Sequence, residues 1–434
     1  MQWNKKSPFL SPGSKYLSTV LLLVLLILGC SSCISSDSPE DVIVPADLVF
    51  LMDKMTLWKG TTKLRGANIW LTRAYGTIFQ GQIGSVPVGP TYTQIDFNHL
   101  AELGANYVNI SHPGLYEESS PFDLDTDAQD SLDSLLAMIA NADMFAVISF
   151  RTGPGRSEFT FSRDEVGDWF DAGDLVETVW SDSAKQTAWV DMWTYTANRY
   201  KDNPIVVGYD LMVEPNSDDV IGGIDAPADF YPSHQDNLED WNPLFARIIT
   251  GIRTVDNTTP ILVGGMGYSA VEWLPYIVTS SDTRTVYTLH QYAPYVYTHQ
   301  DAGGTNSYPG TFDTDGDGSD DSFNLTWLQN LLAAADALSL TIAVDEFGLM
   351  RWVPNAADFM NASFGLFEER NWNHALWQWY PASYPANATY NGQFNFMFGP
   401  TATNYVNVTT SDLIEAIKTN WAKNMFRPSN VIFY

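Results

Sequence analysis

The feature that most constrains the fold is a regular alternation of short apolar runs with longer amphipathic segments, from Leu64 to Lys423. The short runs are typical of buried strands, and the longer segments repeat apolar residues at helical spacing. Strands are expected at 64–70, 107–111, 145–150, 205–212, 260–264, 285–290, 340–344 and 374–379. Helices are expected at 95–103, 128–142, 185–200, 243–253, 325–338, 357–369 and 411–423. Strand then helix, about eight times over, predicts a parallel (β/α)8 barrel.

An open, doubly wound sheet is the competing fold for such a pattern. That fold commonly carries a glycine-rich phosphate loop after an early strand, and this chain has none. Composition does not shift along the ordered part of the chain, so residues 46–434 are expected to form a single domain. We therefore favour the closed barrel.

The first 29 residues have the features of an export signal. Lysines precede an uninterrupted apolar run at 20–28, which is too short for a comfortable membrane span. The segment Ile27-Leu28-Gly29-Cys30 resembles a bacterial lipobox, which would make Cys30 the lipidated N-terminus and residues 30–45 a polar tether. An ordinary secretory signal cut nearby is the alternative. We expect a lipid-anchored protein of the bacterial cell envelope, at the outer membrane or cell surface.

Cysteine and charge usage narrow the classes of function. Cys30 and Cys33 are the only cysteines, so the domain has no disulfide framework, thiolate zinc site or cysteine nucleophile. Loss of the three lysines in the signal leaves 19 of 22 basic side chains against 51 acidic ones, a net charge of −32. Nucleic acids and anionic polysaccharides are therefore poor partners, whereas neutral glycans remain open.

Two glutamates stand where an apolar run gives way to a loop. Glu214 closes the fourth expected strand and Glu346 the seventh. In a (β/α)8 barrel the carboxyl ends of all strands open into one bowl, so both side chains are expected there. Two facing carboxylates, one protonated and one ionised, are the minimum equipment for breaking a glycosidic bond. No cofactor is expected for this chemistry.

These residues resemble glycoside hydrolase family 5, a cellulase-like family of retaining barrel glycosidases, over 64–423. The stretch 208–215 is similar to the family's Asn-Glu-Pro strand and 346–348 to its nucleophile strand. The resemblance implies that Glu214 is the acid/base and Glu346 the nucleophile. It also implies that His290 and Tyr292 match the strand-6 His-x-Tyr, and that Trp379 is the tryptophan beneath the sugar. Trp377 is expected on the same strand face as Trp379, so either is a candidate platform.

Two departures mark an outlying member of that family. Val213 stands where the family usually has asparagine before the acid/base, and Asn109 stands where it usually has a strand-2 arginine. The sugar-binding role is therefore assigned to other polar residues near the strand ends. The candidates are Asn109, His112, Arg151 and Asn216.

The segment 313–321 places oxygen-bearing side chains at alternate positions around glycines. This spacing is similar to a calcium loop, except that Asn324 stands in place of the bidentate glutamate. A solvated acidic turn is the alternative. The predicted ligands of a stabilising calcium ion are Asp313, Asp315, Asp317, Ser319 and Asp321.

The sequence thus predicts a retaining double displacement on a neutral β-linked glycan, with a cellulose-type β-glucan first and β-mannan second. Two alternatives stay open. A non-catalytic, surface-anchored glycan-binding barrel would keep the aromatic residues and tolerate the changes at Val213 and Asn109. A transglycosylase would use the same carboxylates but exclude water.

Overall fold

The computed structural model describes residues 49–384 and 392–434. The predicted signal at 1–29, the lipidation at Cys30 and the tether at 30–45 lie outside the described residues and stay predictions. Within the described ranges, no helix combines the length and the apolar character that crossing a membrane requires.

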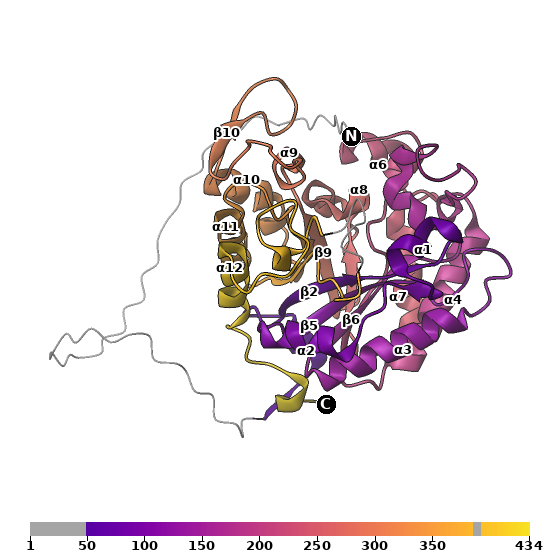
Figure 1. Ribbon diagram of the computed structural model, residues 1–434. Helices are drawn as coiled ribbons and strands as arrows, with labels where there is room; N and C mark the ends of the chain where they lie inside the picture. The colour runs from indigo at the N-terminus through magenta and orange to yellow at the C-terminus, as the bar shows by residue number, and fades with distance from the viewer. Residues whose placement is uncertain (1–48, 385–391) are drawn as a thin grey trace, which may run out of the picture.

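Eight parallel strands close into a barrel, which confirms the predicted fold (Figure 1). Every expected strand is present, with shifts of a few residues at the ends. In barrel order the strands are β12 (Ile342–Phe347), β13 (Asn373–Leu376), β2 (Arg65–Trp70), β5 (Tyr107–Pro113), β6 (Phe145–Thr152), β7 (Val206–Asp210), β8 (Ile261–Gly264) and β9 (Thr285–Gln291).

Helices surround the barrel, with α10, α11 and α12 along one side in Figure 1 and α3, α4 and α7 along the other. The long helices are α2 (Gln94–Glu102), α3 (Thr126–Asn141), α4 (Ser183–Tyr200), α7 (Trp241–Arg253), α10 (Leu325–Asp336), α11 (Ala356–Glu369) and α12 (Asp412–Trp421). Between β8 and β9 the chain forms only the short α8 (Met266–Ser269) and a 3-10 helix (Val271–Tyr276). The sequence shows no long amphipathic segment there, which agrees with that exception.

Shorter elements decorate both ends of the barrel. On the loops that follow the strands, β3 (Thr72–Arg73) pairs with β4 (Val88–Gly89), and β10 (Gly310–Phe312) pairs with β11 (Asp321–Phe323). At the opposite end, β1 (Phe50–Met52) runs parallel to β14 (Val431–Phe433). The remaining short helices are α1 (Thr77–Ile83), α5 (Ser217–Val220), α6 (Pro227–His234) and α9 (Tyr295–Thr298).

The barrel interior changes character along its axis. Its lower half, at the strand starts, is a sealed apolar cluster that includes Val147, Val207 and Leu262. Trp58 closes that end, and its indole nitrogen donates to the carbonyl of Val207 at 2.8 Å. One inward position further along β5, β6, β9 and β12, polar or charged side chains replace the apolar ones, namely those of Asn109, Ser149, Thr288 and Asp345. The polar groups of the interior thus lie toward the carboxyl ends of the strands.

Candidate active site

Glu214 lies in the loop directly after β7, with its backbone in the left-handed region at φ 54°. That conformation costs a non-glycine residue about 1–2 kcal/mol, so surrounding contacts must impose it. The fully buried Arg156 supplies them: its guanidinium donates to the carbonyls of Val213 and Glu214, each at 2.7 Å. Sequence reasoning missed Arg156, because an arginine in a glycine-rich loop carries no signal of which carbonyls it will bind.

Glu346 projects from β12 into the same bowl. A one-residue register shift against β9 falls between Val344 and Glu346, and it turns Glu346 toward the strand ends. The hydroxyl of Tyr292 donates to its Oε1 at 2.6 Å, so this tyrosine takes the position predicted for it. A charged acceptor shortens and strengthens such a bond.

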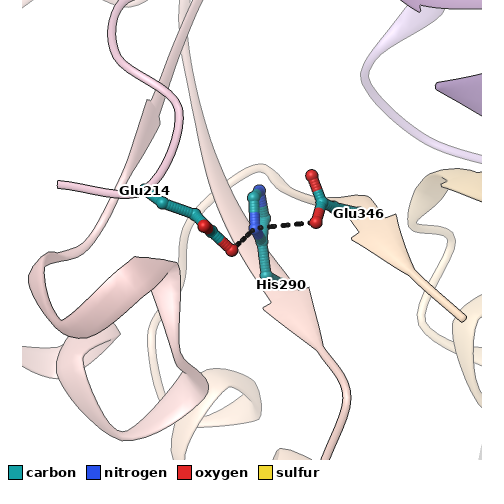
Figure 2. A group of neighbouring side chains, drawn as sticks. All are labelled: Glu214, His290 and Glu346. Atoms are coloured by element: carbon teal, nitrogen blue, oxygen red, sulfur yellow. Dashed lines mark hydrogen bonds and ion pairs between the residues drawn. The ribbon is translucent and has the colours of Figure 1, made fainter. Parts of the chain in front are cut away.

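His290 on β9 stands between the two glutamates (Figure 2). Its Nδ1 lies 2.9 Å from Oε1 of Glu214 and 3.8 Å from Oε1 of Glu346. One carboxylate oxygen from each glutamate and this nitrogen all lie within 4.8 Å of one another. The structure therefore brings together the four residues Glu214, His290, Tyr292 and Glu346, which the sequence placed on three separate strands.

The charges of this group depend on one another. Burial alone would lower the pKa of His290, but the carboxylates of Glu346, Asp345 and Glu214 outweigh it and raise the pKa to about 10. Burial, together with the charge of Glu214, raises the pKa of Glu346 to about 7 against the opposing charge of His290. A proton on Glu214 removes the repulsion between the two carboxylates, so Glu346 ionises most readily when Glu214 is protonated.

Three converging ligand atoms of this kind have the spacing of a divalent metal site. An imidazole that carries protons on both nitrogens has no lone pair to give a metal. The raised pKa of His290 therefore favours an ion-pair cluster over a metal centre.

Arg151, at the end of β6, lies beside this cluster, and its guanidinium bonds neither Glu214 nor Glu346. Its guanidinium forms a buried ion pair with Glu158, at 2.7 Å, and donates to the hydroxyl of Ser111 at 3.1 Å. It stacks on Phe161, 4.0 Å from the ring centre. The charges of Glu346 and Glu214 contribute to the raised pKa of Arg151, and its own charge lowers the pKa of Glu346. Arg151 thus acts on the two glutamates through its charge, and its predicted contact with the sugar stays a prediction.

Trp377 and Trp379 were predicted on one face of the eighth barrel strand, but both lie beyond its end. β13 ends at Leu376, so strand alternation does not extend to Trp379. The indole of Trp379 is buried, donates to the carbonyl of Asp96 on α2 at 3.1 Å and packs on Phe396. Trp379 as the sugar platform was therefore a wrong prediction, because no face of its ring is free. Trp377 is partly exposed and lies 5.8 Å from the guanidinium of Arg151, at the bowl.

Three polar candidates also need correction. His112 faces outward, where its ring bonds the carbonyl of Pro113 at 2.7 Å and Ser131 of α3 at 3.3 Å. Burial there lowers the pKa of His112 to about 4. The parity of β5 was the missed signal: Asn109 faces inward, and a residue three positions later faces outward. His112 is therefore a neutral histidine between the barrel and the surrounding layer of helices, the helical shell.

Asn109 and Asn216 are fully engaged inside the protein and do not face the open bowl. Asn109 donates to Asn68 at 2.8 Å and accepts from Ser149 at 2.7 Å, in a buried polar layer beneath the glutamates. Asn216 donates to Thr160 at 2.9 Å and supports the loop that carries Glu214. Both side chains are buried and hydrogen-bonded to other residues, which contradicts the prediction that they bind the sugar.

Aromatic side chains at the rim complete the bowl, and sequence reasoning did not single them out. Tyr295 on α9 is 52% exposed, and its ring centre lies 6.2 Å from that of Tyr292. On another part of the rim, the indole of Trp70 donates to Glu158 at 3.0 Å, and its ring contacts Tyr384 edge-on. Exposed or partly exposed aromatic faces near carboxylates suit the apolar faces of sugar rings.

The predicted calcium loop joins β10 to β11, away from the carboxylate pair. Carboxylate oxygens of Asp313, Asp315 and Asp317 converge within 4.8 Å of one another. Asp321 instead accepts from the backbone and hydroxyl of Thr314, and Ser319 contributes a backbone N–H to Asp317. Three of the five predicted ligands thus meet, and calcium binding stays a prediction.

The model of the family described as Cellulase (glycosyl hydrolase family 5) matches residues 73–383. Endoglucanase C of Acetivibrio thermocellus is 24% identical over 253 residues, which cover 55% of this chain and 64% of that protein. Endoglucanase C307 of Clostridium sp. (strain F1) is 23% identical over the same share of both chains. The chain thus spans less than two thirds of the length of these relatives.

Solved structures agree on the fold. Cel5A of Thermotoga maritima in complex with cellobiose superposes with a TM-score of 0.56 and 17% identity, covering 84% of this chain and 99% of that one. Its complex with mannotriose superposes with a TM-score of 0.54 and 16% identity, covering 81% and 96%. At these identities the likeness concerns the fold alone.

Proposed function

The chain belongs to the cellulase family, glycosyl hydrolase family 5, and we propose that it is a retaining hydrolase of a neutral β-linked glycan. The observation that carries this proposal is the proximity of the two carboxylates. An oxygen of Glu214 and an oxygen of Glu346 lie within 4.8 Å of each other. Retaining enzymes hold their carboxyl groups about 5–5.5 Å apart, whereas inverting enzymes need about 6.5–9.5 Å to admit a water molecule.

In the first step Glu346 attacks the anomeric carbon, and the bond from that carbon to the leaving oxygen breaks. Glu214 gives its proton to this oxygen, so the leaving sugar departs as an alcohol. In the second step Glu214, now ionised, takes a proton from water, and the water oxygen displaces Glu346. Tyr292 and Arg151 stabilise the ionised Glu346 before attack and after release.

His290 has a defined part in this cycle. Its Nδ1 is 2.9 Å from Glu214 and can donate a hydrogen bond to the carboxylate form. That donation favours the ionised state which Glu214 needs when it activates water. Arg156 acts indirectly, because it stabilises the left-handed backbone conformation that directs Glu214 toward the glycosidic oxygen.

For the substrate, we propose a cellulose-type β-glucan first and β-mannan second. Structures of the Thermotoga maritima neighbour hold cellobiose and mannotriose, both neutral β-linked oligosaccharides. The strongly acidic composition of this chain disfavours anionic glycans. Trp377 and Tyr295 offer the aromatic faces on which such sugars would stack.

The stereochemistry of the first product tests the mechanism. NMR of fresh cello-oligosaccharide digests should show the β-anomer before mutarotation. Glu346→Ala should lose nearly all turnover, and azide should rescue it with a glycosyl azide of inverted configuration. An α-anomer as first product would contradict the retaining mechanism. Tight oligosaccharide binding without any release of reducing ends would support the glycan-binding alternative instead.

We also propose that the protein is exported and anchored at the cell envelope through a lipid on Cys30. Labelling of cells with a radioactive fatty acid should mark the parent chain and the Cys33→Ser variant equally. Cys30→Ser should remove the label and release the protein from the membrane fraction. Equal labelling of both variants would rule out Cys30 as the acceptor.

A further inference from the structure

Asp345, the residue before the nucleophile, is a buried carboxyl group that the mechanism above does not use. It is 2% exposed, and within the described chain neither of its oxygens has a hydrogen bond of normal geometry. A buried carboxylate without partners costs several kcal/mol, so its presence calls for a compensating charge. Its Oδ1 lies 3.5 Å from Nε2 of His290.

The local backbone explains why two consecutive acids face inward. Ala343 belongs to the apolar floor inside the barrel, so alternation also turns Asp345 inward. The register shift after Val344 then adds one residue, which lets Glu346 reach the bowl as well. Asn68 holds this distorted segment by donating to the carbonyl of Asp345 at 2.8 Å. Asp345 therefore lies one layer below Glu346, against the ring of His290.

We propose that Asp345 is a positioning residue for the acid/base, acting through His290: it occupies Nε2 of the imidazole from below and so keeps a proton on Nδ1, facing Glu214. This inference rests on the proposed function of Glu214. It concerns only where the proton on His290 lies.

Both protonation states of the Asp345–His290 pair lead to the same result. If Asp345 is ionised, His290 is a cation with protons on both nitrogens. If Asp345 is protonated, its O–H donates to Nε2, and the remaining ring proton must sit on Nδ1. In either state Nδ1–H donates to Glu214. Without Asp345, a neutral His290 is free to carry its proton on Nε2 and withdraw that donor.

The other charged groups around His290 also influence how strongly its ring holds a proton. From β7 and its following loop come Asp210 and Glu214, and from β12 come Asp345 and Glu346. Arg151 and Arg156, from β6 and its loop, oppose them, but Arg151 is paired with Glu158. Tyr292 is bonded to Glu346, and β8 brings no titratable side chain to this face. Removing the charge of Asp345 therefore lowers the proton affinity of His290.

The pH dependence of kcat/KM on an aryl cellobioside tests the proposal. Asp345→Asn keeps the shape of the side chain but removes its charge. We expect the alkaline limb of the profile to move about one unit or more to higher pH, because loss of the Nδ1–H donor disfavours the carboxylate form of Glu214, with kcat reduced about tenfold or more and KM little changed. Thr285→Val is the matched control, because it replaces a buried threonine of β9 with a side chain of equal size, and within the described chain the hydroxyl of Thr285 has no hydrogen-bond partner. The control should leave the limb in place.

A second measurement remains valid even if no glycan is hydrolysed. Imidazole nitrogen NMR of the full chain, assigned by loss of the signal in His290→Asn, should show His290 with a proton on Nδ1 at pH 8. In Asp345→Asn the ring should titrate at lower pH. An unchanged His290 titration, or an equal shift in Thr285→Val, would overturn the proposal.

The same comparison is also made in a His290→Asn background. There the same substitution should cause no further shift of the alkaline limb, because the group through which it acts is gone. A further shift of equal size would show that Asp345 acts by another route and would contradict the inference.

Discussion

The lower and upper halves of the barrel interior are built by the same strands but differ in kind. Below, Val207, Leu262 and their neighbours bury apolar surface out of contact with water. Above, Asp210, His290 and Asp345 are buried just as deeply, but they are ionisable. Burial in the lower half stabilises the fold, whereas the same burial in the upper half perturbs pKa values. Position along the strand thus separates stability from chemistry.

The pKa values of the buried histidines differ in the same way between the upper interior and the helical shell. His290, His112 and His374 are all buried. Burial lowers the pKa of the two shell histidines to about 4, although hydrogen bonds to each oppose that change. At His290 the carboxylates around the ring reverse the sign of the shift. Neighbouring charge, and not burial by itself, decides which histidine works as a cation.

The largest expected effect is the loss of turnover in Glu346→Gln. We expect kcat to fall about 10⁴-fold or more, because the attacking oxygen is gone. The free energy of unfolding at pH 8 should stay the same or rise, since the variant removes a buried charge. Steady-state kinetics and denaturant titration measure the two quantities. A loss of stability without a loss of turnover would abolish the distinction between the two halves.

The converse change lies in the lower half. Leu262→Ala should lower the free energy of unfolding by about 2–5 kcal/mol, because it opens a cavity in a sealed apolar cluster. The kcat of the folded fraction should stay within about twofold of the parent, since the cluster lies a layer below the carboxylates. Urea unfolding and active-site titration provide both numbers. A large fall in kcat would mean that the floor helps to shape the site.

The pH dependence of stability provides a third test. The pKa of Glu346 rises from 4.5 to about 7 on folding, and that of His290 from 6.5 to about 10. Each group stabilises the fold fully below its unfolded pKa and loses that contribution as pH rises through its folded pKa. The free energy of unfolding should therefore fall between pH 4.5 and 10. In Glu346→Gln, the free energy of unfolding should depend less on pH below pH 7. In Leu262→Ala, it should change with pH as it does in the parent.

The tryptophans test the boundary between bowl and shell. Trp377→Ala should raise KM for cello-oligosaccharides about tenfold, by removing a stacking face, and leave the free energy of unfolding nearly unchanged. Trp379→Ala is the matched control, and it should lower that free energy by about 3–5 kcal/mol because its ring is buried. The reverse pattern would restore Trp379 as the sugar platform.

The smallest expected effect concerns the acidic loop between β10 and β11, which lies outside both halves of the interior. Calcium should raise Tm by about 2–4 °C without changing kcat. Asp315→Ala should abolish that rise, whereas Asp320→Ala, an exposed acid of the same loop, should keep it. Calorimetric titration of the parent with calcium measures the binding directly. If calcium gives no heat of binding, the predicted calcium site is wrong.

The corrected site residues show how far sequence reasoning reaches. Glu214, Glu346 and Tyr292 stand at strand ends, where topology alone decides that they enter the bowl. His112 and Trp379 failed because each depends on which face of a strand it takes and on where that strand ends. Strand boundaries are uncertain by a few residues in a sequence, and one residue reverses the face.

The sequence by itself determined the closed barrel and the residues that would meet at its mouth, because strand and helix periodicity and the order of strands are local properties of the chain. Only the tertiary structure decided the state of those residues. Arg156 holding the backbone of Glu214, and Asp345 lying against His290, join positions 58 and 55 residues apart. Charge and proton position depend on such contacts through a low-dielectric interior, and no local pattern encodes them.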